Sequence, residues 1–147
     1  MHGRAILLVE DNADDETLTL RALRKNNLLN EVIVARDGAE ALDFLFVRGA
    51  HAQRDPHLQL QIVLLDLNLP KINGLNVLRQ LRGDERTRLL PVVVLTSSKE
   101  DEDIIQSYEL GANSYVRKPV DFTKFTEAVK ALGVYWLLLN EDVPRRP

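Results

Sequence analysis

The sequence predicts a single α/β domain built on a five-stranded parallel sheet with helices on both faces. Three observations support this fold class. Short runs of buried-type aliphatic residues recur along the chain, and a segment with helical spacing follows each of them. Such alternation is typical of right-handed βαβ units. The length of 147 residues suits one domain with a single sizeable core.

The first two expected strands are short apolar runs, each followed by a helix. The run over residues 5–9 stops at Glu10 and Asp11. The acidic residues after it suit the first turn of a helix, where the macrodipole favours anions. The run over residues 32–35 leads to Asp37, where a second helix is expected to begin.

The central strand is expected over residues 62–65. Four buried-type residues there are bounded by Asp66 and by a turn that contains Pro70 and Gly74. A parallel strand that is covered on both faces shows such a continuous apolar run. The preceding segment, Arg48 to Gln59, is rich in turn-forming and charged residues and is expected to be a longer surface connection.

The second half of the chain completes the pattern. A fourth strand over residues 91–95 ends at Thr96, and a fifth, shorter strand over residues 113–117 ends at Lys118. From Asp121 onward, apolar residues at helical spacing predict a long last helix. Two further helices are expected over residues 74–82 and 99–110. We expect a domain over residues 1–140 and a short tail over residues 141–147.

Composition restricts the class of protein. The chain is 45% hydrophobic and 28% charged, which is ordinary for a globular domain. Its net charge of −3 and pI near 5.6 provide no overall attraction to nucleic acid or acidic lipid, so we expect no direct DNA binding and no membrane association. The absence of cysteine excludes disulfides and thiolate metal sites. The first apolar run is too short for a signal peptide, and a cytoplasmic location is expected.

The functional prediction depends on the residues that end the strands. The carboxyl ends of parallel strands meet at one edge of the sheet, where ligands bind in open α/β folds. That edge should collect Glu10, Asp11, Asp66, Thr96 and Lys118. Three neighbouring carboxylates repel one another, so at least one pKa should rise unless a cation neutralises them, and hard oxygen donors favour Mg²⁺ over zinc. A carboxylate, a metal, a lysine and a hydroxyl suit phosphoryl transfer, with Asp66 as the nucleophile.

Each of these residues has a simpler explanation when it is taken alone. Glu10 and Asp11 could be loop acids before a helix, and Lys118 could be a solvated surface lysine. Asp66 and Thr96 could cap the segments that follow them. The joint pattern, with every residue at a strand end, outweighs these separate explanations.

In combination, these motifs resemble the receiver domain of response regulators along almost the whole chain, and in particular the single-domain type. The resemblance implies a flavodoxin-like fold and the function of a two-component signalling switch. It also implies that the protein is not an enzyme beyond weak self-phosphorylation and autodephosphorylation. The motifs are Val9-Glu10-Asp11-Asn12, Leu65-Asp66-Leu67-Asn68-Leu69-Pro70 with Gly74, Val94-Leu95-Thr96-Ser97-Ser98, Gly111-Ala112, and Tyr115 with Lys118-Pro119.

The resemblance also assigns roles to individual residues. It implies that Asp66 accepts a phosphoryl group from the phosphohistidine of a sensor histidine kinase. Asp11, Asp66 and the backbone carbonyl of Asn68 would ligate Mg²⁺ (or Mn²⁺), with Glu10 assisting through water, and Lys118 would balance the phosphoryl charge.

Thr96 and one aromatic residue are the implied switch residues. In such receivers Thr96 moves toward the phosphoryl group and the aromatic residue, here Tyr115, rotates inward. The alternative for Tyr115 is that it simply packs under the sheet edge with its hydroxyl in water.

Further features resemble the regulators that are paired with bacterial phytochromes. These features are the long connection from Arg48 to Gln59, the residues around Lys71 and Tyr108, and an aromatic ending at Tyr135 and Trp136. The resemblance implies a light-sensing kinase as partner and a homodimer joined through the fourth and fifth helices and the strand between them. The alternative is that the last helix folds back on its own domain. The dimer candidates are Ile105, Tyr108, Phe125, Val129, Tyr135 and Trp136.

Other functions remain as alternatives. The protein could be a phosphorelay intermediate or a phosphate sink. A small aspartate-nucleophile phosphatase would need a second Asp two residues after Asp66, where this chain has Asn68. A degenerate receiver that acts only as a dimer scaffold would not need the intact acid, Thr and Lys set. A nucleotide-binding domain would need a Gly-rich loop where Glu10 and Asp11 stand.

Overall fold

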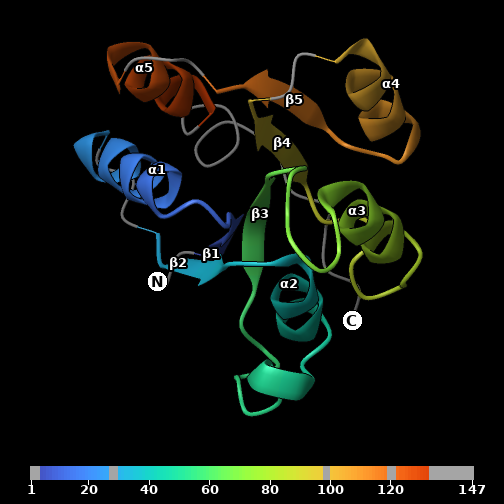
Figure 1. Ribbon diagram of the computed structural model, residues 1–147. Helices are drawn as coiled ribbons and strands as arrows, with labels where there is room; N and C mark the ends of the chain where they lie inside the picture. The colour runs from blue at the N-terminus through green and yellow to red at the C-terminus, as the bar shows by residue number, and fades with distance from the viewer. Residues whose placement is uncertain (1–3, 27–29, 98–99, 119–121, 133–147) are drawn as a thin grey trace.

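The computed structural model describes residues 4–26, 30–97, 100–118 and 122–132. It contains one five-stranded parallel sheet with the strand order β2-β1-β3-β4-β5 (Figure 1). The strands are β1 (Ala5–Val9), β2 (Val32–Ala35), β3 (Leu60–Leu65), β4 (Val92–Thr96) and β5 (Ser114–Arg117). The helices are α1 (Ala13–Lys25), α2 (Gly38–Leu45), α3 (Gly74–Arg82), α4 (Asp101–Glu109) and α5 (Phe122–Leu132), with a 3-10 helix η1 (Gly49–His51).

Helices cover both faces of the sheet. Figure 1 shows α1 and α5 side by side on one face and α2, α3 and α4 on the other. Side chains along each strand alternate between these layers because successive residues of a strand point to opposite faces. Leu7 and Val9 of β1 join the core under α2 and α3, whereas Ile6 and Leu8 join the core under α1. The predicted doubly wound α/β fold is confirmed.

The strand register places the functional edge. One row of paired residues crosses the whole sheet, from Ala35 through Val9, Leu65 and Val94 to Tyr115. Asp66 directly follows this row. The residues that end the other strands therefore reach the same edge from neighbouring strands, as the sequence predicts.

Some segments differ in detail from the prediction or lie beyond it. The connection from Arg48 to Gln59 contains the short helix η1 and is therefore not wholly irregular. Among the described residues, no helix has the length and apolar character that crossing a membrane requires. Residues 133–147 lie outside the described part of the chain, so the predicted limit between domain and tail stays a prediction.

Candidate functional site

Asp66 occupies the centre of the carboxyl edge. It follows β3 directly, and its backbone N–H donates to the carbonyl of Val9 at 3.1 Å, which extends the pairing with β1 by one residue. Its carboxylate is buried. The Oδ1 atom accepts hydrogen bonds from the hydroxyl of Thr96 at 2.8 Å and from the backbone N–H of Asn68 at 3.1 Å. Hydrogen bonds with three parts of the chain, at Val9, Asn68 and Thr96, therefore hold Asp66 in place.

The loop after β3 approaches Asp66 so closely that it needs a glycine. A Cβ atom added to Gly74, the first residue of α3, would lie 2.3 Å from the backbone oxygen of Asp66. The N–H of Gly74 also donates to the carbonyl of Leu67 at 3.0 Å. Glycine at this position allows α3 to begin directly against the strand end.

An acidic pair follows β1. Glu10 is buried, and its Oε2 accepts from the backbone N–H of Asn12 at 3.3 Å, whereas Asp11 is exposed. Glu10, Asp11 and Asp66 each offer a carboxylate oxygen, and these atoms lie within 4.8 Å of one another. Three hard oxygen donors so close together fit a divalent cation such as Mg²⁺ or Mn²⁺. The structure thus brings together the residues that the sequence assigns to metal binding, with Asn68 beside them.

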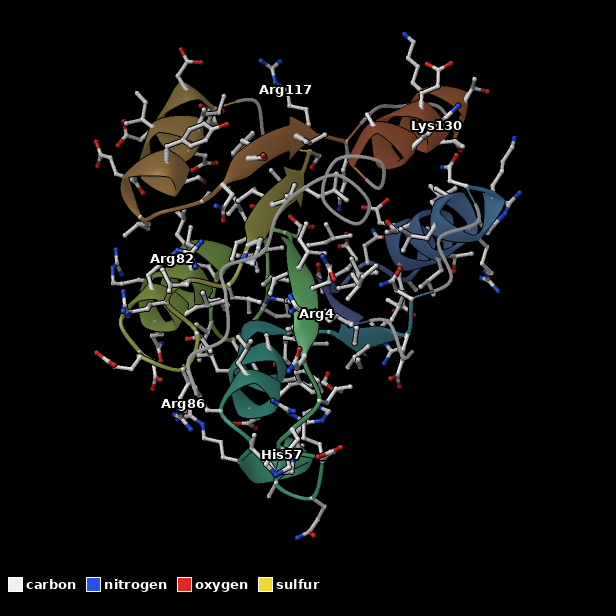
Figure 2. The ribbon with its side chains drawn as sticks, turned by 180° about the vertical axis from the view of Figure 1, so that it is seen from behind. Arg4, His57, Arg82, Arg86, Arg117 and Lys130 are labelled. Carbon is white, nitrogen blue, oxygen red and sulfur yellow. The ribbon has the colours of Figure 1, made fainter. Side chains whose placement is uncertain are left out.

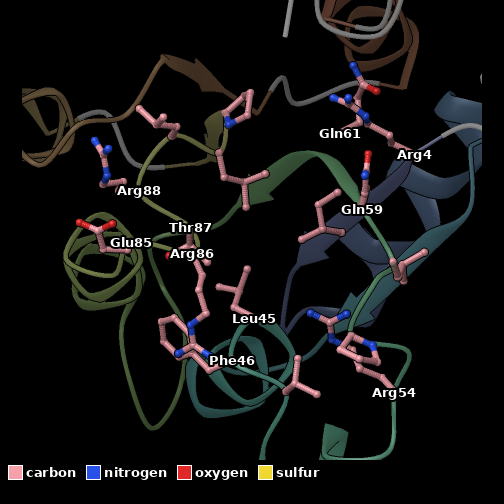
Figure 3. Close-up of a pocket in the computed structure, with 17 residues that line it drawn as sticks. Arg4, Leu45, Phe46, Arg54, Gln59, Gln61, Glu85, Arg86, Thr87 and Arg88 are labelled. Atoms are coloured by element: carbon pink, nitrogen blue, oxygen red, sulfur yellow. The ribbon is translucent and has the colours of Figure 1, made fainter. Parts of the chain in front are cut away.

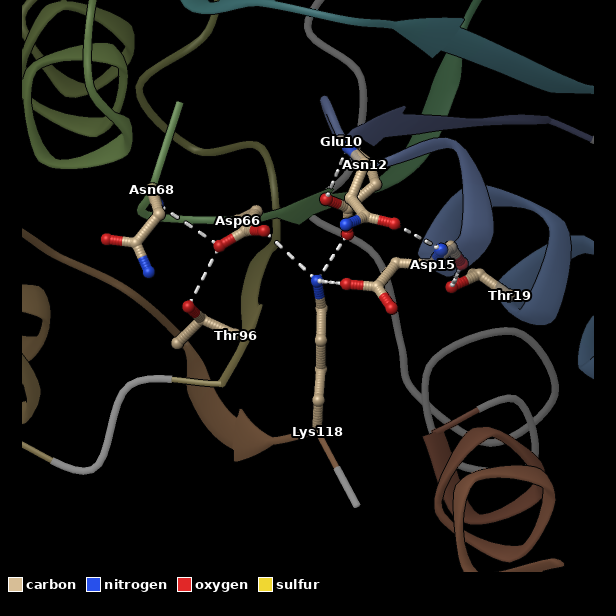
Figure 4. Close-up of polar contacts among 8 residues, drawn as sticks. All are labelled: Glu10, Asn12, Asp15, Thr19, Asp66, Asn68, Thr96 and Lys118. Atoms are coloured by element: carbon tan, nitrogen blue, oxygen red, sulfur yellow. Dashed lines mark hydrogen bonds and ion pairs between the residues drawn. The ribbon is translucent and has the colours of Figure 1, made fainter. Parts of the chain in front are cut away.

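Lys118 reaches these acids from the end of β5, the strand next to β4. It follows β5, and its backbone N–H donates to the carbonyl of Thr96 at 2.8 Å. Its side chain is only 7% exposed, and its Nζ contacts Glu10 Oε1, Asp66 Oδ2 at 3.0 Å and Asp15 Oδ2 at 3.0 Å (Figure 4). The ammonium is therefore surrounded by carboxylates from three parts of the chain.

Burial and charge set the protonation of the site. Burial raises the pKa of Glu10 to about 7, although Lys118 opposes this rise. Burial acts in the same direction on Asp66, but the charge of Lys118 and the hydrogen bonds to the carboxylate outweigh it, so the pKa of Asp66 lies below its ordinary value. Burial alone would lower the pKa of Lys118, yet its contacts with Glu10 and Asp66 raise it.

The predicted pKa rise thus falls on Glu10, and burial is its largest cause, ahead of repulsion by Asp66. Asp66 stays ionised at neutral pH. An ionised carboxylate beside a hydroxyl donor and an ammonium can act as a nucleophile toward an electrophilic centre that gains negative charge.

The predicted switch residues lie in adjoining strands. Thr96 is fully buried at the end of β4 and already contacts Asp66. Tyr115 lies in β5, half-buried, and packs against the core under α2 and α3. Its strand pairs with β4, and Tyr115 lies opposite Val94, two residues before Thr96.

The structure describes the side chains of only two of the six predicted dimer candidates. Ile105 and Tyr108 lie on α4, and each is 51% exposed. Phe125 and Val129 lie in α5, but their side chains are outside the described part of the structure. Tyr135 and Trp136 also lie outside the described residues.

Asp15 is the site residue that sequence reasoning missed. The sequence suggested only that it favours the first turn of α1 by its charge. Asp14, Asp15 and Glu16 all stand in that turn, and nothing in the local sequence singles out Asp15. Its contact is with a lysine that follows in the chain by 103 residues, which no local pattern indicates.

A separate pocket lies at the opposite, amino edge of the sheet. It has a volume of about 930 Å³ and is bordered by both apolar and polar side chains, which include Arg4, Arg54, Arg86 and Arg88 (Figure 3). Figure 2 places Arg86 and His57 at this end of the molecule and Arg117 at the other. Within the described ranges, Thr96, Asn68 and Lys118, which contact Asp66, are not among the residues that border this pocket.

The fold and the site together define a class of protein. A doubly wound sheet with an acidic pair, an aspartate, a threonine and a lysine at its carboxyl edge is the arrangement expected of a receiver domain. Residues 6–130 match the family described as the response regulator receiver domain, and the chain belongs to this family. Receiver domains in general are phosphorylated by histidine kinases and act as switches in two-component signalling.

Two relatives match over most of their length. The probable methanogenesis regulatory protein FilR2 of Methanothrix harundinacea is 40% identical over 137 residues, which cover 93% of this chain and 86% of FilR2. Response regulator Rcp1 of Synechocystis sp. is 37% identical over 134 residues, which cover 91% of this chain and 89% of Rcp1.

Solved structures of phytochrome response regulators are also similar. The phosphorylated cyanobacterial phytochrome response regulator RcpA matches with a TM-score of 0.88 and 36% identity, over 95% of this chain and 98% of RcpA. The bacteriophytochrome response regulator AtBRR matches with a TM-score of 0.77 and 55% identity, over 96% of this chain and all of AtBRR. The Mn²⁺-bound form of Rcp1 matches with a TM-score of 0.87 and 34% identity, over 96% and 99% of the two chains. The resemblance to phytochrome-associated regulators is confirmed.

Proposed function

We propose that this protein is a response regulator that accepts a phosphoryl group on Asp66 from the phosphohistidine of a sensor histidine kinase. The observation that carries this proposal is the set of contacts on one carboxylate. The ammonium of Lys118 approaches Asp66 Oδ2 at 3.0 Å, and the hydroxyl of Thr96 donates to Oδ1 at 2.8 Å. After the transfer, both groups can donate their hydrogen bonds to the negatively charged oxygens of the phosphoryl group in place of the carboxylate.

The transfer is a displacement at phosphorus. A carboxylate oxygen of Asp66 forms the new P–O bond while the P–N bond to the kinase imidazole breaks, and the electron pair of that bond leaves with the imidazole nitrogen. Lys118 and Thr96 donate hydrogen bonds to the phosphoryl oxygens. Mg²⁺ or Mn²⁺, held by Glu10, Asp11 and Asp66 with the carbonyl of Asn68, would supply neutralising charge for those oxygens.

Phosphorylation would act as a switch through Thr96. Its hydroxyl now donates to Asp66 Oδ1, and a phosphoryl group on that residue would offer it a new acceptor. Movement of Thr96 would change the space at the end of β4, to which the half-buried Tyr115 of β5 could respond. The added charge of about −2 can shift such an equilibrium only if it interacts better with one of the two states.

The proposed kinase is a light-sensing phytochrome in the cytoplasm. This part of the proposal is supported by the relatives RcpA and AtBRR, which are phytochrome response regulators. We further propose a homodimer through α4, β5 and α5, supported by the exposure of Ile105 and Tyr108 on α4. Its mass in light scattering at micromolar concentration should be twice that of the chain, and a monomeric mass would contradict it.

The direct test compares Asp66→Asn with the parent. Both are treated with acetyl phosphate and Mg²⁺, and acid-labile phosphate on the protein is measured. We expect labelling of the parent and no labelling of Asp66→Asn, because an amide cannot form the acyl phosphate. Asp14→Asn is the matched control, since Asp14 is an exposed acid near the same edge. Equal labelling of Asp66→Asn and the parent would contradict the proposal.

A further inference from the structure

The ammonium of Lys118 has one more carboxylate partner than the proposed reaction requires. An ammonium has three N–H donors, and all of them face carboxylates here, those of Glu10, Asp66 and Asp15. Glu10 belongs to the acidic cluster that fits a cation, and Asp66 is the proposed phosphoryl acceptor. Asp15 has neither role, although its Oδ2 lies 3.0 Å from Nζ, as close as that of Asp66.

Asp15 is held where it can make this contact. Its backbone N–H donates to the side chain of Asn12, the residue that caps α1, at 3.0 Å. Its carbonyl accepts from the hydroxyl of the fully buried Thr19 at 2.9 Å (Figure 4). Because hydrogen bonds hold both the N–H and the carbonyl of Asp15, only its two side-chain torsions remain to direct its carboxylate.

The contact belongs to Asp15 and not to the acidic first turn as a whole. Glu16 pairs with Arg36 at 3.1 Å on another side of the helix. Within the described part of the chain, the exposed side chain of Asp14 makes no hydrogen bond or ion pair. Three acids stand in one turn, and a single one of them reaches Lys118.

We propose that Asp15 is a positioning residue that holds the Lys118 ammonium in the unphosphorylated protein and competes for it with the phosphoryl group on Asp66. This proposal rests on the proposed function. A phosphoryl oxygen can gain an N–H donor of Lys118 only if one present partner gives it up. Glu10 is 2% exposed, whereas the side chain of Asp15 is 36% exposed. Water can therefore replace Lys118 at Asp15 with the smallest loss of free energy.

The first measurement is the rate of Asp66 labelling by acetyl phosphate and Mg²⁺. Asp15→Asn keeps the shape of the side chain and removes its charge, so Lys118 should transfer more readily. Only the Asp15 side of this ion pair is partly exposed, and loss of such a pair should make labelling about 2- to 10-fold faster than in the parent. Asp14→Asn makes the same charge change in the same turn and should stay within about twofold of the parent. Asp15→Glu should return the rate toward that of the parent.

The second measurement uses no phosphodonor. The NMR signal of the Lys118 ammonium reports how fast its hydrogens exchange with water. Exchange should be faster in Asp15→Asn than in the parent and unchanged in Asp14→Asn, a difference that a general loss of charge would not produce. Exchange that is equal in Asp15→Asn and Asp14→Asn would overturn the holding role.

The two measurements separate the possible failures. A labelling rate in Asp15→Asn that is equal to or below that of Asp14→Asn would overturn the competition, even if Asp66 is phosphorylated normally. If the parent itself is not labelled on Asp66, the proposed function fails and the competition fails with it, while faster ammonium exchange in Asp15→Asn would still support the holding role.

Discussion

The two edges of the sheet both carry many charged side chains, but they use them differently. At the carboxyl edge, the carboxylates that follow β1 and β3 and one carboxylate of α1 converge on the single Nζ atom of Lys118. At the amino edge, arginines are spread around a pocket, and the described contacts do not bring them to one shared atom. Arg54 donates to the carbonyls of Phe44 and Asp55 and lies over the ring of Phe44.

The difference teaches that the proposed phosphorylation site is distinguished by the convergence of its charges on one atom, and not by the density of charge. Arg86 at the amino edge forms an ion pair with Asp84, two residues away, and its guanidinium lies over the ring of Phe46. Its carboxylate partner therefore comes from its own loop. At the carboxyl edge the same kinds of charges come from distant parts of the chain and change each other's pKa values. Mutations of charged residues at the carboxyl edge should therefore change the labelling of Asp66 or the affinity for Mg²⁺, whereas those at the amino edge should change only the free energy of unfolding.

The largest expected effect is on the backbone that supports the carboxyl edge. Gly74→Ala would place a Cβ atom 2.3 Å from the backbone oxygen of Asp66, so the loop after β3 must shift. We expect the free energy of unfolding to fall by about 3 kcal/mol, as for overpacking of a tight site. Urea denaturation measures this change. Gly83→Ala is the control, because its added Cβ would meet nothing closer than 3.4 Å, and an equal loss in both variants would refute the explanation.

The convergence itself is tested by removing its cation. Lys118→Met should reduce labelling of Asp66 by acetyl phosphate about 100-fold, because a preorganised donor to the transferred phosphoryl group is lost. Arg88→Met removes a cation from the amino edge and should leave labelling unchanged. Comparable losses in the two variants would mean that overall charge, and not contact with Asp66, controls the reaction.

The pKa of Glu10 predicts a pH dependence at the carboxyl edge. A carboxylic acid must lose its proton before it can bind a cation, and the pKa of Glu10 is raised to about 7. Mg²⁺ affinity should therefore be highest above this value and fall by up to about tenfold for each pH unit below it. Calorimetric titration across this range measures the trend, and Glu10→Gln should flatten it. An affinity in the parent that does not depend on pH between 5 and 8 would be contrary to this assignment.

The smallest expected effect is at the amino edge. Arg54→Lys keeps the charge but loses the planar group that lies 4.2 Å from the Phe44 ring centre and donates to two carbonyls. We expect the free energy of unfolding to fall by about 1 kcal/mol, with labelling of Asp66 unchanged. Arg88→Lys is the control, because no hydrogen bond or ion pair joins its side chain to another described residue. A change in Asp66 labelling would show that the two edges are coupled.

The sequence by itself determined the parallel sheet and most of the site. Apolar runs end where strands end, and the residues that follow them, such as Asp66 and Lys118, must reach the same edge because parallel strands have one direction. Gly74 belonged to the recognised motif, but only the structure shows which carbonyl oxygen its missing Cβ would strike.

Tertiary packing alone decided the contacts that depend on how a helix sits on the sheet. Nothing in the local pattern around Asp15 distinguishes it from Asp14 or Glu16, because all three suit a first helical turn. The rotation of α1 against the sheet and α5 directs Asp15 toward Lys118, and that rotation depends on contacts between residues far apart in the chain. Local sequence sets where a helix begins, while long-range packing sets which side chain it presents.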